Sequence, residues 1–421
     1  MALSIEDALK QIDEWVEPLH SEIVSLEASI GRILFNDVVA VYNLPAFNNS
    51  AMDGYAIKHK DAGKEVIVGD TIFAGDNSQD IVEDGCTLKI MTGARIPQGG
   101  EAVVPIEDIE IISDNVILLP SKIRDAQHVR YEGEDIKSGD KLLHAGIKIH
   151  AHHITMLASQ GISHVYVTKR PRVAVFASGK ELKMHFETVE AHQIHNTNTP
   201  TFLARSTELG CDVIFIGTAE DTLDDIKKHI SSALEGADLI ITSGGVSVGD
   251  ADFTKEAFSS FDYETYFSKI DIKPGKPTTF GRIGRTYVLN LPGNPLAAAV
   301  NFEIFAQSII LKLHNARRPY IGSFKAKMKK DFTQRVGKYT VIPGYYDGEF
   351  FEPVEKRSPG MVSPLASSNA FMITDDKVGN INEGETILLI PTRWQVCTQE
   401  KSDIITTEEA LELSRARQLV D

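Results

Sequence analysis

The feature that most constrains the fold is a regular alternation of short apolar runs with amphipathic segments between residues 172 and 320. Four apolar runs of five or six residues occur there: VAVFAS, DVIFIG, DLIITS and YVLNL. Segments with helical periodicity lie between or after them: TFLARSTELG, LDDIKKHISSAL and LAAAVNFEIFAQSIILKL. Apolar runs that alternate with helices are typical of a parallel sheet covered by helices on both faces. We therefore predict a central doubly wound α/β domain.

The flanking regions have other patterns. Residues 39–139 are rich in Val, Ile, Gly and Asp, with short alternating runs such as AVVPIEDIEI and NVILL, which predict a mostly β domain. Helical patterns are expected at residues 4–17 and 21–34, and a strand followed by a helix at 140–170. Beyond residue 320 the pattern favours a small β domain, which a polar helical tail (TTEEALELSRARQ) follows.

Charge and cysteine usage narrow the classes of partner. The 421 residues include 43 basic and 59 acidic side chains, a net charge of −16. This balance argues against a nucleic-acid surface and against adsorption to a membrane. Three cysteines far apart in sequence, without a CxxC pair, indicate a reducing compartment and no structural zinc. The start of the chain lacks the pattern of a signal peptide, and we find no apolar run of membrane-spanning length, so we expect a cytoplasmic protein.

Four polar loops follow the apolar runs of the predicted parallel sheet. They are SGKEL (178–182), GTAEDT (217–222), SGGVSVGDAD (243–252) and LPGNP (291–295). In a doubly wound sheet, ligands bind beyond the carboxyl ends of the strands, so we expect these loops to form one site. The third loop combines glycines suited to binding an anion through backbone N–H groups with two carboxylates that would repel it. A bridging cation resolves this conflict.

Magnesium fits the expected cation best, because it prefers oxygen ligands and commonly binds substrate phosphates as well. We predict Glu181, Asp221 and Asp252 as metal ligands, with Asp250 nearby, and Gly244, Gly245 and Ser247 as substrate-binding residues. The loop does not have the ending of a P-loop or the spacing of GxGxxG. Glycines after a strand can also simply form a turn, and an aspartate there can cap a helix. The presence of four such loops favours a ligand site over that structural interpretation.

Lys273 and Lys276 lie in the segment IKPGKP (272–277), between two prolines. A loop stiffened by proline loses less freedom when its lysines bind an oxyanion. At an effective dielectric constant near 20, one such contact is worth on the order of 4 kcal/mol before desolvation is subtracted. The alternative is a solvated basic turn.

The N-terminal half contains three further glycine-containing stretches: NSAMDGYAI (49–57), IMTGARIP (90–97) and VRYEGEDIKSGD (129–140). Their polar residues Asp53, Thr92 and Asp135 are, taken singly, more typical of turns than of catalysis. The histidines between 144 and 153, without a carboxylate at ligand spacing, favour a structural role. No Ser–His–Asp arrangement can be assigned.

Taken together, these stretches resemble the MoeA-type molybdopterin molybdenumtransferases, a family that includes the C-terminal domain of gephyrin. The similar motifs occur in order: NSAMDGYA, IMTGARIP, GEDI, FASGKEL, SGGVSVGDADFTK, IKPGKP, LPGNP and, more loosely, SPGMVSPLASSNA. The resemblance implies four domains. We expect the α/β domain at 1–20 plus 172–320, a connector domain at 21–38 plus 140–171, the mostly β domain at 39–139 and a β-barrel-like C-terminal domain at 321–421.

The resemblance also implies an activity. Such proteins insert molybdate into adenylylated molybdopterin in a magnesium-dependent reaction that releases AMP. By this similarity Glu181, Asp221 and Asp252 surround nucleotide and metal, and Lys273 and Lys276 bind oxyanions. Pro292 and Pro295 would form a rigid loop, with Ser363 near molybdate. Asp53, Thr92 and Asp135 would face the cleft from the other subunit of an elongated homodimer, as further catalytic residues.

Two departures from the family pattern concern molybdate contact: Ala297 stands where a serine is common, and Pro343 stands nearest to an expected arginine. Two alternative functions remain open. One is a gephyrin-like scaffold, and the other is the preceding step, adenylylation of molybdopterin. The adenylyltransferase of the same pathway is also an expected partner.

Overall fold

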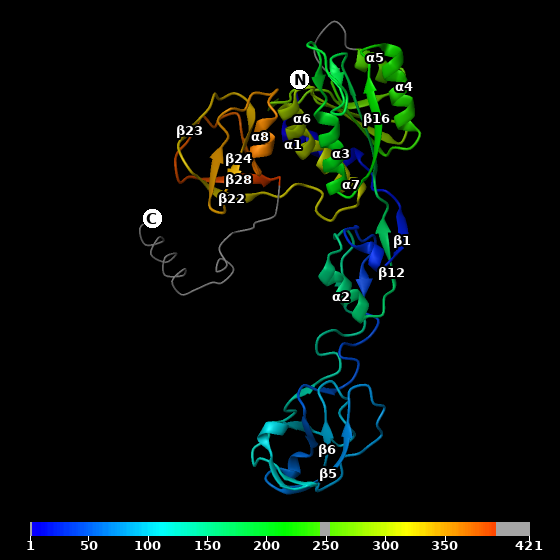
Figure 1. Ribbon diagram of the computed structural model, residues 1–421, viewed down its shortest axis with the longest axis vertical. Coiled ribbons are helices and arrows are strands. Elements are labelled where there is room, and N and C mark those ends of the chain that lie inside the picture. The colour runs from blue at the N-terminus through cyan, green and yellow to red at the C-terminus, as the bar shows by residue number, and fades with distance from the viewer. Residues whose placement is uncertain (1, 245–252, 393–421) are drawn as a thin grey trace. The chain divides into compact units, whose positions relative to one another are not determined.

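The computed structural model describes residues 2–244 and 253–392 (Figure 1). The chain forms two compact units, which are treated separately below. The larger unit comprises Met1–Leu19 and Lys169–Asp421, and the smaller comprises His20–Thr168. The predicted tail helix TTEEALELSRARQ lies outside the described residues.

A six-stranded sheet forms the centre of the larger unit. Its order is β16 (Asp212–Ala219), β13 (Arg172–Ser178), β17 (Leu239–Ser243), β21 (Thr286–Leu291), β20 (Thr279–Ile283) and β18 (Glu264–Phe267). The first four strands are parallel and correspond to the four apolar runs, as predicted. The last two pair antiparallel and were not expected from the sequence. They extend the sheet beyond β21 because a tight turn returns the chain from β20 directly into β21.

Helices cover both faces of this sheet. One face carries α1 (Ile5–Trp15), α3 (Asn198–Glu208), α6 (Pro295–Asn301) and α7 (Gln307–Leu313), and the other carries α4 (Leu223–Leu234) and α5 (Phe253–Ser259). The alternation along β13 shows why. Val173 and Val175 enter the first core, whereas Ala174 and Phe176 enter the second. The doubly wound α/β prediction is confirmed.

A π-helical stretch, Phe302–Ala306, joins α6 to α7. Together they form one helix, Pro295–Leu313, that is long and apolar enough to cross a membrane, and most of it is buried inside the protein. The expectation that no segment reaches this length was therefore wrong. Two polar residues of this helix are buried and hydrogen-bonded: Asn301 Nδ2 donates to the backbone oxygens of Ala297 and Pro274, and Glu303 accepts from Arg205. The helix is a core element of the larger unit.

The C-terminal part of the larger unit closes into a barrel. Five strands pair in a ring: β24 (Tyr339–Tyr346), β25 (Phe350–Pro353), β22 (Phe324–Met328), β28 (Thr386–Pro391) and β26 (Ala370–Thr374). Pairing of β26 with β24 completes the ring. The two-residue strand β19 (Ile272–Lys273) adds to β24 from outside. The predicted small β domain is confirmed, and its barrel surrounds a core of its own.

The smaller unit combines a helix-containing part with a β-rich part. In the first, β1 (Ser21–Ser25) pairs antiparallel with β12 (His164–Thr168), beside α2 (Ala151–Ser159). The helix expected at 21–34 was therefore wrong: a strand and a short 3-10 turn, Glu27–Ser29, stand there. Pairing with a distant strand overrides local helical periodicity here.

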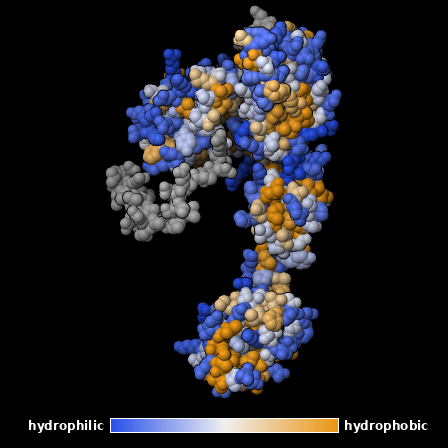
Figure 2. Space-filling model, viewed as in Figure 1, coloured by the Kyte–Doolittle hydropathy of each residue, from blue (hydrophilic) through white to orange (hydrophobic). Residues whose placement is uncertain are grey.

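The β-rich part agrees with the prediction for residues 39–139. Its main sheet has the order β7 (Ala102–Pro105), β4 (Gly54–Ile57), β6 (Cys86–Ile90), β5 (Glu65–Ile72), β9 (Val116–Leu118) and β8 (Glu110–Ser113). Apolar colour gathers on its surface in Figure 2, and its exposed large apolar side chains include Ile67, Phe73 and Ile111. The four domain boundaries given above stay a prediction.

Candidate functional site

The carboxyl ends of the four parallel strands lie level with one another. The register pairs Ser178 with Ala219, Ala177 with Ser243, and Ser243 with Leu291. The four polar loops therefore leave the sheet at one edge, as the sequence predicts.

The loops after β13 and β17 approach each other so closely that position 244 requires glycine. A Cβ on Gly244, at φ +95°, would lie 2.4 Å from the carbonyl oxygen of Ser178. A Cβ on Gly293 would lie 3.6 Å from the Cα of Gly244. Backbone therefore packs on backbone where β13, β17 and β21 end. Gly245, Ser247, Asp250 and Asp252, which continue the glycine loop, lie outside the described residues.

Asn198 links two of the loops, and sequence reasoning missed it. Its Nδ2 donates to Ser243 Oγ at 2.6 Å and to Gly293 O at 2.8 Å. The side chain is buried, at the first residue of α3. Asparagine at a helix start is usually interpreted as a cap, which hides this role. The useful signal was the asparagine-rich stretch HNTN just before the predicted helix.

Glu181 and Asp221 follow the adjacent strands β13 and β16. Glu181 is exposed and Asp221 half-buried, and neither side chain makes an ion pair with another described residue. Their free carboxylate oxygens are the donors that magnesium prefers. Within residues 2–244 and 253–392, however, no three His, Cys, Asp or Glu side chains group closely enough to hold a metal. Of the three predicted ligands, Glu181 and Asp221 are thus described, and Asp252 lies outside the described residues.

Lys273 and Lys276 are exposed, and neither ammonium group pairs with a carboxylate in the part of the chain that the structure describes. Their backbone is held at several points. Lys273 lies opposite Thr340 of β24, and Ile270 N donates to Lys276 O at 3.0 Å. The loop therefore presents two unpaired positive charges on a fixed backbone.

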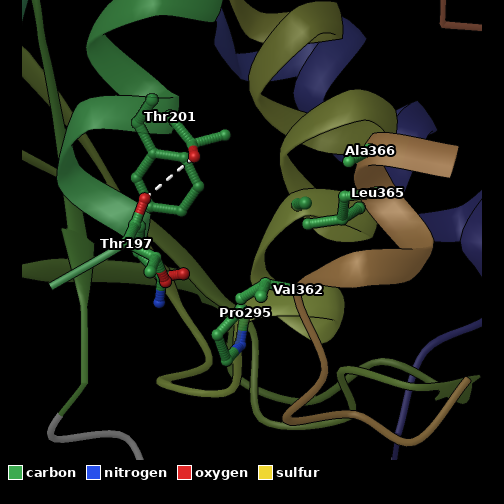
Figure 3. A pocket seen from close by; sticks show the side chains of 9 residues that line it. Thr197, Thr201, Pro295, Val362, Leu365 and Ala366 are labelled. Atoms are coloured by element: carbon green, nitrogen blue, oxygen red, sulfur yellow. Dashed lines mark hydrogen bonds between the residues drawn. The ribbon is translucent and has the colours of Figure 1, made fainter. Parts of the chain in front are cut away.

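A pocket of about 170 Å³ lies where the LPGNP loop meets the C-terminal part (Figure 3). Its wall comes from the starts of α3 and α6 and from the segment around α8 (Ser363–Ser367). Leu296 N donates to Pro359 O at 3.0 Å across this junction. The structure thus places Pro295 beside the segment that carries Ser363, which is exposed; Pro292 is buried at the end of β21.

Comparisons with known proteins bear on the whole chain. Three family descriptions match it: MoeA N-terminal region (domain I and II) over residues 3–161, probable molybdopterin binding domain over 174–312, and MoeA C-terminal region (domain IV) over 325–392. The molybdopterin molybdenumtransferase of Haemophilus influenzae is 33% identical over 393 residues, covering 91% of this chain and 96% of that protein. That of Staphylococcus aureus (strain COL) is 31% identical over 412 residues, covering 94% and 97%. The chain belongs to the molybdopterin molybdenumtransferase family.

Solved structures agree with this membership. The molybdopterin biosynthesis MoeA protein of Pyrococcus horikoshii OT3 superposes with a TM-score of 0.81 at 26% sequence identity, covering 93% of this chain and all of that one. A second structure of a MoeA protein from the same genus gives a TM-score of 0.83 at 26% identity, covering 94% of this chain. The resemblance inferred from the motifs is confirmed.

In the smaller unit, two of the predicted site residues, Asp53 and Thr92, lie in contact. Asp53 Oδ1 accepts from Thr92 N and from Thr92 Oγ1, each at 2.7 Å. These bonds, the backbone one first, lower the pKa of Asp53 below its ordinary value. Asp135 is exposed and lines a separate pocket of about 500 Å³, together with Leu44 and His152. No hydrogen bond among the described residues joins it to Asp53 or Thr92.

The histidines of this unit fit the structural interpretation. His153 Nδ1 accepts from His150 N at 3.1 Å, which caps the start of α2.

The two residues that depart from the family pattern, Ala297 and Pro343, are both buried. Ala297 is 2% exposed, and its carbonyl accepts a hydrogen bond from Asn301 Nδ2. Pro343 is buried in β24 opposite Phe371. Neither offers a surface side chain to an anion.

Proposed function

We propose that this chain inserts molybdate into adenylylated molybdopterin and releases AMP, completing the molybdenum cofactor. Family membership supports the coarse activity, molybdenum insertion in cofactor biosynthesis. One structural observation carries the location of the site: the four strand-end loops are level. An anionic substrate that spans this edge would meet the glycine loop that begins at Gly244.

The roles of the side chains follow from their charge. Lys273 and Lys276 would bind molybdate or a phosphate, because their ammonium groups have no carboxylate partner among the described residues and their loop backbone is held in place. The N–H groups of the loop at Gly244 and Gly245, with Ser247, would donate hydrogen bonds to the oxygens of a phosphate. Pro292 and Pro295 would hold the LPGNP loop rigid, with Ser363 near molybdate. The protein needs no covalent nucleophile for this reaction.

Magnesium is the expected cation of the site. Glu181, Asp221 and Asp252 would hold it, and the donor set of carboxylate oxygens suits a hard cation. When bound, it would supply positive charge that favours cleavage of the anhydride. The carboxylates themselves would keep the cation at the ends of β13 and β16, where Glu181 and Asp221 have no cationic partner among the described residues.

The remaining proposals concern assembly. Asp53, Thr92 and Asp135 would complete the site of a partner subunit in a homodimer with composite active sites. The adenylyltransferase of the same pathway would be a partner. The widely spaced cysteines, without a CxxC pair, favour a reducing compartment, in line with a cytoplasmic protein.

The test of this function is an insertion assay. Purified protein with adenylylated molybdopterin, molybdate and magnesium should release AMP, and excess chelator should stop the release. Full release in chelator would remove magnesium from the proposal. Incubation with molybdopterin and ATP, without molybdate, tests the adenylyltransferase alternative. Formation of adenylylated product under those conditions would favour that alternative instead.

A further inference from the structure

Asn301 is a buried amide that contacts the IKPGKP loop from the helix that follows the LPGNP loop. It is the last residue of α6, and its side chain is fully buried. Its Nδ2 donates to Ala297 O, one turn earlier, at 2.7 Å. The same Nδ2 lies 3.3 Å from Pro274 O, between the two lysines of the IKPGKP loop. One amide therefore joins the helix that follows LPGNP to the lysine loop.

Gly275 shows how closely the loop approaches this amide. A Cβ there would lie 1.7 Å from Asn301 Nδ2 and 2.8 Å from its Cγ. The residue also has φ +115°, a conformation that favours glycine. The sequence KPGK is thus explained by contact as well as by backbone shape: the turn between the lysines lies directly on the Asn301 side chain.

Thr278 completes the contact from the other end of the loop. Its Oγ1 lies 3.0 Å from Asn301 Oδ1 and 2.9 Å from Gly275 O. Thr278 is fully buried, so these groups have no solvent to replace a lost partner. The amide of Asn301 thus has both its donor and its acceptor used in fixing residues 274–278.

We propose that Asn301 is a positioning residue for oxyanion binding by Lys273 and Lys276. This inference rests on the proposed function, in which those lysines bind molybdate or a phosphate. Each lysine has a long flexible stem, so the position of its ammonium group depends on where the backbone is held. Asn301 holds that backbone and fixes it to the helix that starts at Pro295. The IKPGKP loop and the LPGNP loop, which leads into that helix, therefore keep one relative position.

The test compares Asn301→Ala with Ser308→Ala on the same helix. Ser308 is buried, and its Oγ donates to Ile304 O at 2.8 Å, so its loss removes a buried hydrogen bond without touching the lysine loop. Binding of molybdate and of AMP is measured by calorimetry at low and high salt, with thermal unfolding as a check of folding. Asn301→Ala should weaken binding of at least one anion about tenfold at low salt. Ser308→Ala should leave both affinities unchanged.

Three further variants keep the test decisive. Thr278→Val removes only the hydroxyl near Asn301 Oδ1 and should give a smaller loss in the same direction, which covers the case in which Asn301→Ala does not fold. Lys273→Ala and Lys276→Ala report on the proposed function itself. If the lysine variants lose binding while folded Asn301→Ala and Thr278→Val retain it, the positioning role is wrong. If the lysine variants retain binding, the proposed role of the lysines is wrong instead.

Discussion

Asp53 Oδ1 accepts two hydrogen bonds from a single residue, the backbone N and the Oγ1 of Thr92, both at 2.7 Å. Asp53 immediately precedes β4 and Thr92 follows β6, and these strands are neighbours, with Gly54 opposite Ile90. The two family motifs NSAMDGYA and IMTGARIP thus meet at one carboxylate. Because the sheet sets this position, the carboxylate is oriented before any substrate arrives.

The first prediction follows from the charge of that carboxylate. The hydrogen bonds favour the ionised form, so the pKa of Asp53 lies below 3.8. A group whose pKa is lower in the folded state stabilises the fold above its unfolded pKa, and this contribution is lost as pH falls through the folded pKa. Thr92→Val removes the hydroxyl bond but retains the backbone bond. NMR titration should show the pKa of Asp53 rising part of the way towards 3.8, and an unchanged pKa would contradict the assignment of the hydroxyl.

The second prediction concerns Asn198, which joins Ser243 to Gly293. Asn198→Ala leaves Ser243 Oγ and Gly293 O without their donor, so we expect a loss of about 1–3 kcal/mol of unfolding free energy and a clear fall in kcat/KM. The control is Thr286→Val at the other edge of the same sheet, where Thr286 Oγ1 donates to Ala237 O at 2.9 Å. The control should lose stability but retain activity. Equal losses of activity in both variants would reduce Asn198 to a general structural residue.

The third prediction tests the shared site. If Asp53 of one subunit completes a cleft made by Asp252 and Lys273 of the other, Asp53→Ala and Asp252→Ala homodimers are both inactive. In a mixed dimer one site collects both changes and the other collects neither. Random mixing makes about half of the dimers mixed, so about a quarter of normal activity should return. A mixture as inactive as its parents, despite demonstrated subunit exchange, would mean that Asp53 acts within its own subunit or only in folding.

The fourth prediction concerns the ion pair of α3 with the π-helical stretch. Arg205 Nε and Nη2 donate to the two carboxylate oxygens of Glu303 at 2.7 and 2.8 Å, and Glu303 is 7% exposed. Removing one partner leaves a buried charge, so Arg205→Met should cost about 3–5 kcal/mol of unfolding free energy. The double variant Arg205→Met with Glu303→Leu should recover most of that loss in chemical denaturation. A double variant no more stable than the single one would show that the charges are not coupled.

The sequence predicted the elements whose pattern is local and repeated. The apolar runs VAVFAS, DVIFIG, DLIITS and YVLNL became the four parallel strands, because burial on both faces leaves an unbroken apolar run. The segment SEIVS was predicted as part of a helix and is a strand, because its partner HVYVT lies more than a hundred residues away. The antiparallel strands β18 and β20 were missed for a related reason: Gly281 and the polar residues around it give no apolar run.

The sequence predicts candidate site residues where charged side chains follow the ends of strands. It does not predict the buried amides that hold the backbone of the loops in place. Lys273, Lys276, Glu181 and Asp221 carry charge, which a sequence shows directly. Asn198 and Asn301 act by hydrogen bonds to loops distant in the chain, so their role is visible only once the fold brings those loops to them. A glycine between two prolines and two lysines was the one sequence signal of the contact at Asn301.

The most direct test of the central claim is AMP release by the Lys273→Ala, Lys276→Ala double variant beside the unchanged protein. The substrates are adenylylated molybdopterin and molybdate with magnesium, and folding of both proteins is checked by thermal unfolding. Both lysines are exposed, so their removal should leave the fold intact. The account predicts molybdate-dependent AMP release by the unchanged protein and a loss of at least about a hundredfold in the folded double variant. No release by the unchanged protein, or full release by the variant, would contradict it.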